Sequence, residues 1–416
     1  MRNFMFTIAL TFLPFASVLI AQNTTMQHMG MDHKNGPLKK TGKTVYPVSG
    51  KIRTYYIAAD EVAWDYVPGN TDAMTGKPFE GVEKLLTERG PTRIGKVYVK
   101  AIYREYTDST FTKLKPRKPD EEYLGLLGPI LRAEVGDVFH IVFKNNATKP
   151  YSMHPHGVFY EKPSEGAVYD KDNGEDSHDG NVVPPGGRCT YVWEIPERAG
   201  PGPNDASSVV WFYHSHVNEP KDVNAGLIGA MIITAKGKAK PDGTPKDVDR
   251  EFVSLYTIFD ENSSWYLDQN VRTYCGITNR DSMNKLESEV LRPDSILSLT
   301  KANKASSFLP VGFGGTNFRF AINGFSFGSM PMMTMKKGEK VRWYLLALGN
   351  AFNFHTPHWH GNVVLYNGQR TDVIALSPAQ MAVADMVPDN VGMWMYHCHV
   401  DDHMEAGMMA MYQVLE

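Results

Sequence analysis

The chain is poor in several features that would restrict its class. It has 416 residues but only three cysteines, too few for a scaffold held together by disulfides. Its 43 Lys and Arg against 46 Asp and Glu give a net charge of −3, which argues against nucleic acid or an anionic membrane as a partner. Beyond residue 21 no apolar run reaches the roughly 18 residues of a membrane-spanning helix. A globular protein of two or three domains remains.

The one long apolar stretch is at residues 1–21, which read MRNFMFTIALTFLPFASVLIA. An early Arg, an apolar run and small residues at its end are typical of a cleaved secretory signal, and Pro14 disfavours a membrane anchor. We therefore expect export to the periplasm or the extracellular space, and a flexible Met- and His-containing segment at residues 22–48. Export permits disulfides, but the sequence leaves open whether Cys189 and Cys275 pair or remain thiols.

Strand signals dominate the rest of the chain. Runs of β-branched and aromatic residues, bounded by Gly, Pro, Asn or Asp, occur at 96–103, 137–143 and 189–195. Residues 236–249 are rich in Lys, Gly and Pro and have no apolar period, which indicates a linker. The sequence therefore predicts an all-β protein with two domains of similar size, at residues 49–235 and 250–416.

The two halves share a motif. Residues 211–216 read WFYHSH and residues 394–399 read WMYHCH, identical at four of six positions. Each is preceded by an H-x-H-G, at 154–157 and 358–361. This self-similarity indicates an internal duplication.

The first half carries an insert between its two motifs, which are 58 positions apart (156 to 214) against 37 in the second half (360 to 397). Much of the insert is the stretch 161–181, with seven carboxylates. A solvated loop is one interpretation. The alternative is a calcium site, because hard cations bind carboxylate and carbonyl oxygens. The candidate ligands are Asp176, Asp179 and Asn181.

Ten of the fourteen histidines lie in four short clusters. In a strand, side chains i and i+2 face the same side, so each H-x-H presents two imidazoles together. Four such pairs supply eight imidazoles, enough for three copper ions. The pairs are His154 and His156, His214 and His216, His358 and His360, and His397 and His399.

Cys398 lies between two of these histidines, so its thiol points to the opposite face of the strand. His403 and Met408 follow it, and His355 precedes the third pair. Two His, one Cys and a weak axial Met are the ligand set of a blue-copper electron-transfer site. The tripeptide 397–399 therefore connects two predicted metal sites covalently.

The first half lacks this second kind of site. Aligned on the duplication, Ser215 takes the position of Cys398, and the positions of His355 and His403 hold Tyr151 and Pro220. The first half then supplies only cluster ligands. The sequence predicts four coppers per chain, one in the single site and three in the cluster.

With these motifs the sequence resembles the multicopper oxidase family, and within it the ceruloplasmin-like members. The resemblance covers nearly the whole chain after residue 21 and implies two cupredoxin-like Greek-key β-barrels, one in each predicted domain. It rests on YYIAADEVAWDY (55–66), YREYTDSTF (103–111), LGLLGPILRAEVGD (124–137), YHSHVNEPKDVNAGLIGAMII (213–233), DREFVSLYTIFDENSSWYL (249–267), FAINGFSFGSMP (320–331) and HCHVDDHMEAGM (397–408).

Carried over position by position, the resemblance implies a function for each of these side chains. It makes His154 and His358 the ligands of the single type 2 copper. The implied reaction takes one electron at a time from a reductant at type 1 copper and reduces O₂ to water at the cluster. The resemblance assigns type 1 copper to His355, Cys398, His403 and Met408, and the type 3 pair to His156, His214, His216, His360, His397 and His399.

Two carboxylates follow the H-C-H. Asp401 resembles the acid that delivers protons during O₂ reduction in the family, and Asp402 the acid that faces the reducing substrate. Two solvent-exposed acids are the alternative interpretation. The family's ferrous-iron site uses a Glu and a His where this chain has Gly315 and Phe320, which puts efficient ferroxidase activity in doubt.

Methionines are also clustered, at residues 330–335 and 393–409. Thioethers are soft ligands that suit Cu(I), so a function in copper handling is one interpretation. Packing in the hydrophobic core is the commoner use of methionine.

A trinuclear cluster needs H-x-H pairs from both domain types, and head-to-tail contacts between chains can close a ring that supplies them. Two-domain members of the family are trimers, so the resemblance implies a homotrimer with clusters between chains. We expect a laccase-like oxidase that uses O₂ and a small reductant such as a phenol, an aromatic amine or a metal ion. The alternatives are a metallo-oxidase for Cu(I) or Fe(II) and, less favoured, a non-catalytic copper-binding protein. A copper nitrite reductase needs only three histidines at its catalytic copper and has no H-C-H, so the four complete pairs argue against it.

Overall fold

Strands account for most of the regular structure, as the sequence predicts. The computed structural model describes residues 50–168, 180–279, 282 and 312–416. The expected signal and the segment that follows it lie outside these residues, as do the calcium candidates Asp176 and Asp179. The fold is a cupredoxin-like, Greek-key β fold, which confirms the predicted class.

The first half forms two four-stranded sheets. In one sheet β1 pairs in parallel with β4 and antiparallel with β2, so chain neighbours are not always sheet neighbours. The order in this sheet is β2 (Val97–Tyr106), β1 (Ile52–Asp65), β4 (Val138–Asn145) and β6 (Arg188–Glu194). The order in the other is β3 (Leu131–Glu134), β8 (Ile228–Thr234), β7 (Ser208–His214) and β5 (His154–Pro155).

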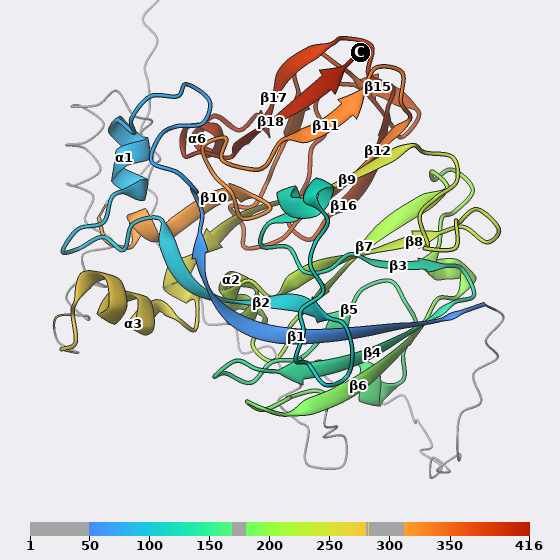
Figure 1. Cartoon of the computed structure of the whole chain (residues 1–416), viewed down its shortest axis with the longest axis horizontal. Helices are drawn as coiled ribbons and strands as arrows, with labels where there is room; N and C mark the ends of the chain where they lie inside the picture. The colour runs from blue at the N-terminus through green and yellow to red at the C-terminus, as the bar shows by residue number, and fades with distance from the viewer. Residues whose placement is uncertain (1–49, 169–179, 280–281, 283–311) are drawn as a thin grey trace, which may run out of the picture. The chain divides into compact units, whose positions relative to one another are not determined.

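The second half repeats this arrangement with a larger first sheet. Its strands β9 and β12 pair in parallel, as β1 and β4 do, and β11 and β18 pair in parallel, as β3 and β8 do. Figure 1 shows β11, β17 and β18 side by side in orange to red. The six-stranded order is β10 (Phe318–Ile322), β9 (Arg250–Asp260), β12 (Val341–Ala347), β16 (Met381–Met386), β14 (Val364–Tyr366) and β15 (Gln369–Thr371); the four-stranded order is β11 (Met333–Lys336), β18 (Met409–Leu415), β17 (Gly392–Cys398) and β13 (Pro357–Trp359).

The helices of the described residues are short, and two of them follow the H-x-H motifs. α2 (Glu219–Ala225) begins after His216, with Asn218 as its N-cap and Pro220 in its first turn, and α6 (Asp401–Glu405) begins after His399. The described part of the chain contains no helix with the length and hydropathy needed to cross a bilayer. The other short elements are α1 (Gly81–Thr87), α3 (Leu267–Asn270), η1 (Pro119–Leu124), η2 (Lys162–Ser164), η3 (Glu197–Ala199), η4 (Glu261–Ser263), η5 (Val271–Cys275) and η7 (Gly315–Asn317).

The segment between β8 and β9, predicted as a linker, contains turns and a single isolated bridge from Ala239 to Pro245. The halves nevertheless share buried surface, because one hydrophobic cluster includes Leu126 and Ile228 from the first half and Phe252 and Leu255 from the second. The two halves therefore pack together through apolar side chains.

A fully buried ion pair also joins the halves. Nζ of Lys100, on β2, contacts Oε1 of Glu261, on η4, and neither side chain is exposed to solvent. Lys100 also donates to the carbonyl oxygen of Asn224 at 2.7 Å, and the hydroxyl of Tyr66 donates to Glu261 at 2.5 Å. A buried charge needs such partners, so this group fixes how β2 meets η4.

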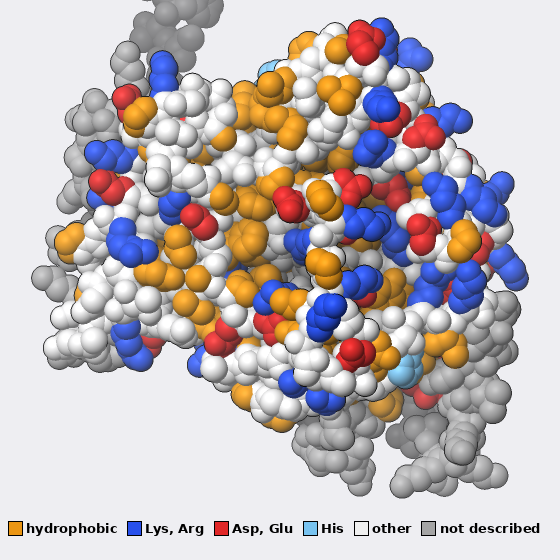
Figure 2. Space-filling model, viewed as in Figure 1, with side chains coloured by type: hydrophobic (Ala, Val, Ile, Leu, Met, Phe, Trp, Pro, Cys, Tyr) orange, Lys and Arg blue, Asp and Glu red, His pale blue; other side chains and the backbone are white. Residues whose placement is uncertain are grey.

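Some of the clustered methionines are packing residues. Met330, Met333 and Met335 are buried in the core of the second half, as is the predicted ligand Met408, whereas Met332 and Met393 are exposed. No disulfide joins Cys189 to Cys275 in the described residues. Figure 2 shows basic and acidic side chains interspersed on one face, in keeping with the small net charge.

Candidate metal centres

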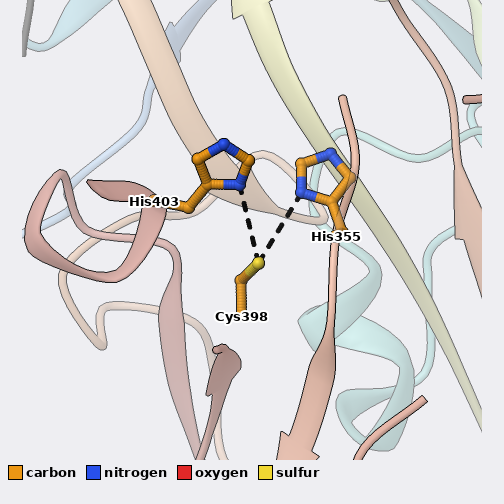
Figure 3. A group of neighbouring side chains, drawn as sticks. All are labelled: His355, Cys398 and His403. Atoms are coloured by element: carbon orange, nitrogen blue, oxygen red, sulfur yellow. Dashed lines mark hydrogen bonds between the residues drawn. The ribbon is translucent and has the colours of Figure 1, made fainter. Parts of the chain in front are cut away.

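Three predicted type 1 ligands converge in the second half. Sγ of Cys398, at the end of β17, lies 3.5 Å from Nδ1 of His403 and 3.8 Å from Nδ1 of His355 (Figure 3). All three side chains are buried. A thiol and two imidazole nitrogens facing one another without solvent fit copper, which favours nitrogen and sulfur ligands.

Neighbouring groups orient this cluster. Nε2 of His355 lies 3.1 Å from Oδ1 of Asn353, which leaves Nδ1 free to face the sulfur. The backbone N–H of Thr356 donates to the sulfur of Cys398 at 3.3 Å. Burial raises the pKa of the Cys398 thiol, and a bound cation reverses that preference because it stabilises the thiolate.

Met408 and Phe320 complete the surroundings. Met408 is fully buried, and its carbonyl oxygen accepts a 3.1 Å hydrogen bond from the backbone N–H of Cys398. The ring of Phe320 packs 5.5 Å from the ring of His403, centroid to centroid. An apolar ring therefore covers the imidazole at the position where the family's iron site has a histidine.

The four other second-half histidines form a separate group. His358, on β13, pairs in register with His397 on β17. Nε2 of His397 lies 3.1 Å from Nδ1 of His358 and 3.0 Å from Nε2 of His360, and the ring of His399 lies 5.0 Å from that of His358. The strand periodicity thus brings both H-x-H pairs together, as predicted.

The first-half histidines are arranged in the same way. His154 pairs in register with His214, Nε2 of His156 lies 3.1 Å from Nε2 of His214, and the rings of His154 and His216 are 5.1 Å apart. Nδ1 of His154 lies 2.7 Å from the carbonyl oxygen of Glu165. That bond leaves Nε2 of His154 available as a ligand.

Burial favours the neutral form of five of these imidazoles. It lowers the pKa of His156 to about 4, of His214 to about 3 and of His397 to about 4. The pKa values of His154 and His358 are lowered for the same reason, with neighbouring histidines adding to the effect. Neutral imidazole is the form that binds metal, so both groups are ready for metal at neutral pH.

The glycine of each H-x-H-G has a steric reason. Gly157 and Gly361 both have φ of +73°, a left-handed conformation that favours glycine. A Cβ would lie 2.2 Å from the ring of Trp211 in the first half and 2.5 Å from the ring of Trp394 in the second. Within each half, the tryptophan that begins the second motif therefore packs directly against the glycine that ends the H-x-H-G.

The first-half and second-half histidine groups do not meet. Within the described residues, no hydrogen bond or ring contact joins a histidine of one group to a histidine of the other. Close to these motifs in sequence, Phe159 in the first half and Val363 and Met393 in the second are exposed apolar side chains. Exposed apolar side chains of this kind are suited to contact with a protein.

The remaining predicted site residues are spread around these groups. Asp401 and Asp402 form the first turn of α6, where Asp401 is exposed and Asp402 is half-buried. Asn181 is buried, and neither of its side-chain amide atoms has a hydrogen-bond partner. Gly315 is buried in η7, next to β10.

Several residues around the sites were not predicted from the sequence. Asp372 contacts Nε2 of His358 at 3.6 Å, and the hydroxyl of Tyr412 donates to the carbonyl oxygen of His360. Asn353 orients His355, and Asp222 contacts Ser215 between two first-half histidines. Asn353, Asp222 and Tyr412 lie within six positions of a predicted ligand, and that closeness is the one signal that points to them. Asp372 is twelve positions from the nearest predicted ligand, His360.

Both halves of the chain match models of one protein family. Residues 124–238 and 296–416 each match a family model described as multicopper oxidase. Together the two matches cover more than half of the chain and include every predicted copper ligand.

Three proteins with similar sequences are a ferroxidase, a hephaestin and a ceruloplasmin. Human "Ferroxidase HEPHL1" is 44% identical over 366 residues, which are 87% of this chain and 29% of that protein. Mouse hephaestin is 38% identical over 372 residues, which are 88% of this chain and 30% of that protein. Human ceruloplasmin is 38% identical over 371 residues, which are 88% of this chain and 31% of that protein. The chain thus spans about a third of the length of these curated relatives.

Solved structures share the fold at low sequence identity. A crystal structure of a multicopper oxidase has a TM-score of 0.51 and 18% identity, over 88% of this chain and 89% of that one. A blue copper oxidase from Nitrosomonas europaea has a TM-score of 0.52 and 17% identity, over 88% of this chain and 86% of that one. These likenesses establish the architecture alone.

Proposed function

Because the chain belongs to the multicopper oxidase family, we propose that it is a copper-dependent oxidase that takes single electrons from a small reductant and reduces O₂ to water. The observation that carries this proposal is that the Cys398 site and the second-half histidine group are joined through two adjacent residues, His397 and Cys398. Cys398 faces His355 and His403, while its neighbour His397 faces His358 and His360. An electron accepted at the thiolate site thus has a path of two adjacent residues to the histidine group.

The proposed ligands follow the sequence prediction. His355, Cys398, His403 and Met408 would hold type 1 copper, and His154 and His358 would hold type 2 copper. Bound copper supplies one-electron transfer at the first site and O₂ binding and reduction at the others. The type 3 pair is assigned to His156, His214, His216, His360, His397 and His399.

The chain itself supplies orientation, exclusion of water and protons. Asn353 and Thr356 hold His355 and the Cys398 sulfur in a dry site. We assign proton delivery during O₂ reduction to Asp401, and contact with the reductant to Asp402. The position of both at the start of α6, directly after the H-C-H, supports this division.

We also propose that the active form is a homotrimer in which each cluster lies between two chains. The separation of the two histidine groups supports this, because a trinuclear cluster needs ligands from both. The exposed Phe159, Val363 and Met393, which are three or four positions in sequence from His156, His360 and His397, suit burial in an interface. A head-to-tail ring brings the first-half group of one chain to the second-half group of the next.

The leading reductant is a phenol or an aromatic amine, in a laccase-like reaction of broad specificity. Two features argue against efficient iron oxidation. Gly315 has no side chain that could bind iron, and the apolar ring of Phe320 packs against the ring of His403. The names of the similar human and mouse proteins favour the alternative, a metallo-oxidase for Fe(II) or Cu(I). The apolar N-terminal stretch supports a site of action in the periplasm or the extracellular space.

Oxygen uptake by the copper-loaded protein tests the proposal. Catalytic efficiency is compared for a phenol, Fe(II) and Cu(I) in one buffer, with copper-free protein as the control. Preference for the phenol supports the laccase-like reaction, and preference for a metal ion supports the alternative. Copper-loaded protein that consumes no O₂ with any of the three contradicts both and leaves a copper carrier.

Calcium at the acidic insert is a separate proposal. The buried Asn181, whose amide has no hydrogen-bond partner, supports it, together with the carboxylates of Asp176 and Asp179 in the sequence. A calcium chelator is expected to lower the melting temperature without removing copper. An unchanged melting curve contradicts the proposal.

A further inference from the structure

The first half keeps the backbone frame of the type 1 site without its metal ligands. The N–H of Ser215 donates to the carbonyl oxygen of Leu227 and that of Cys398 to Met408, both at 3.1 Å. The N–H of Ser152 donates to Oγ of Ser215 at 3.1 Å, just as Thr356 donates to Sγ of Cys398 at 3.3 Å. Ser215 therefore keeps both of these hydrogen bonds of Cys398, while its hydroxyl contacts a carboxylate and not two imidazoles.

A buried carboxylate takes the missing contacts. Asp222, on α2, has no solvent exposure. Its Oδ2 accepts hydrogen bonds from Oγ of Ser215 at 2.7 Å and from the backbone N–H groups of Val217 and Asn218 at 3.0 Å each. Its Oδ1 accepts from Nε1 of Trp265 at 2.8 Å. Four donors satisfy this buried charge, and such charge-assisted bonds are strong.

These bonds fix the two histidines that flank Ser215. The carboxylate holds the end of β7 through Ser215 and the start of α2 through Val217 and Asn218. In the second half the equivalent crosslink runs from Cys398 to His403, through the site that fits copper. The first half has an internal anion where the second half has room for a metal.

We propose that Asp222 is a positioning residue that holds His214 and His216 in the geometry needed to bind cluster copper. The inference rests on the proposed function, since it assumes that these histidines are cluster ligands. Trp265 lies between η4 and α3, so the same carboxylate also ties the first-half histidines to the second half of the chain. The first-half group is thus held in place before any metal arrives.

Asp222→Asn in the full-length, copper-loaded protein tests this function. An amide has only one oxygen, so its NH2 group must face either Ser215 and the N–H groups of Val217 and Asn218, or the indole N–H of Trp265. We expect about 10- to 100-fold weaker binding of cluster copper, by analogy with the loss of groups that orient metal ligands. The type 3 absorption and the type 2 EPR signal then fall, while the type 1 blue band stays. Asp205→Asn, an exposed carboxylate of the first half, is the matched control and retains all the signals.

Ser215→Ala provides a second, milder variant, in case the loss of the buried carboxylate prevents folding. It removes one of the four donors and should weaken the cluster signals in the same direction by a smaller factor. Variants that retain all cluster copper, or that lose the blue band in parallel with the cluster signals, overturn the positioning function. Cluster copper that is missing from the unmodified protein rejects the proposed function as well, so the two failures are distinguishable.

Discussion

Nδ1 of His397 donates a 2.8 Å hydrogen bond to the carbonyl oxygen of the next residue, Cys398. The bond turns Nε2 of His397 toward His360, while Sγ of Cys398 points the other way, toward His403. Two adjacent residues therefore belong to two different groups of ligands. They are linked both by the chain and by a hydrogen bond, and this arrangement makes the effects of single substitutions separable.

Cys398→Ser is expected to abolish the blue absorption and to slow O₂ uptake by at least about 100-fold, because the hydroxyl is a poor copper ligand. The histidine groups are untouched, so the type 2 EPR signal stays. Absorption, EPR and O₂ uptake of the same sample check this. Cys275→Ser, the same change at a half-buried thiol in η5, serves as the control and should leave all three unchanged. A blue, active Cys398→Ser protein contradicts the type 1 assignment.

Mixed assemblies test whether clusters lie between chains. His156→Ala disables the first-half group and His360→Ala the second-half group, so neither protein alone has an intact cluster. After the two are unfolded, mixed and refolded together, about a quarter of the junctions pair two intact groups. O₂ uptake should return to about a quarter of the unmodified rate, whereas either variant refolded alone stays inactive. Light scattering that reports a monomer with four coppers excludes the trimer.

The copper-free protein should lose stability as the pH falls below neutrality. Burial lowers the pKa of His214 to about 3, from an ordinary value of 6.5. Between these values the unfolded chain binds a proton that the folded chain does not, so the free energy of unfolding falls with pH. Each unit of difference is worth about 1.4 kcal/mol for a buried group. Urea unfolding from about pH 7.5 to about pH 4.5 measures the slope, and His214→Asn should make it shallower. A flat profile for the unmodified protein contradicts this.

The buried Lys100–Glu261 pair should be costly to break. Lys100→Met leaves Glu261 buried without its cation and is expected to lower the free energy of unfolding by about 3–5 kcal/mol. The double variant Lys100→Met/Glu261→Leu should recover much of that loss, since no charge is then left unpaired. Lys115→Met is the matched control, because Lys115 is more than half exposed in its ion pair with Glu105 and should cost at most about 1 kcal/mol. Equal effects at Lys100 and Lys115 would show that burial of the pair does not matter.

Comparing Gly361→Ala with Gly368→Ala separates the cost of the left-handed backbone conformation from the cost of a steric collision with Trp394. Gly368 has nearly the same φ, +76°, but nothing within 4 Å of an added Cβ. Gly368→Ala should cost about 1–2 kcal/mol from the left-handed conformation alone. Gly361→Ala adds a collision with Trp394, worth a further 1–3 kcal/mol or so, and should also displace the adjacent His360 and reduce copper content. Equal melting temperatures for the two variants would exclude the collision.

Local periodicity made the metal-binding groups predictable. The i and i+2 rule brought His358 and His360 to one side of their chain segment and turned Cys398 away from His397, and the structure has each of these relationships. These inferences succeed because strand geometry repeats every two residues, whatever the rest of the fold. The approach of Cys398 to His355, 43 positions away, was predicted from the ligand set of a blue-copper site instead.

Contacts set by packing were not predictable in this way. Lys100 and Glu261 are 161 positions apart, and Asp222 and Trp265 are 43 apart. Their partners depend on how η4 meets the first half, and no sequence period encodes that. The one local hint is that the first-half loop from His216 to Gly226 is two residues longer than its counterpart from His399 to Gly407.

The separation of the two histidine groups has a consequence for counting. In the proposed assembly a closed ring has as many junctions as chains, whereas an open string of chains has one fewer and leaves an unmatched group at each end. The copper content per chain therefore measures ring closure, independently of molecular mass. A preparation that binds less copper than expected is not necessarily damaged at any ligand, because opening the ring at one junction removes a whole cluster and leaves every histidine intact.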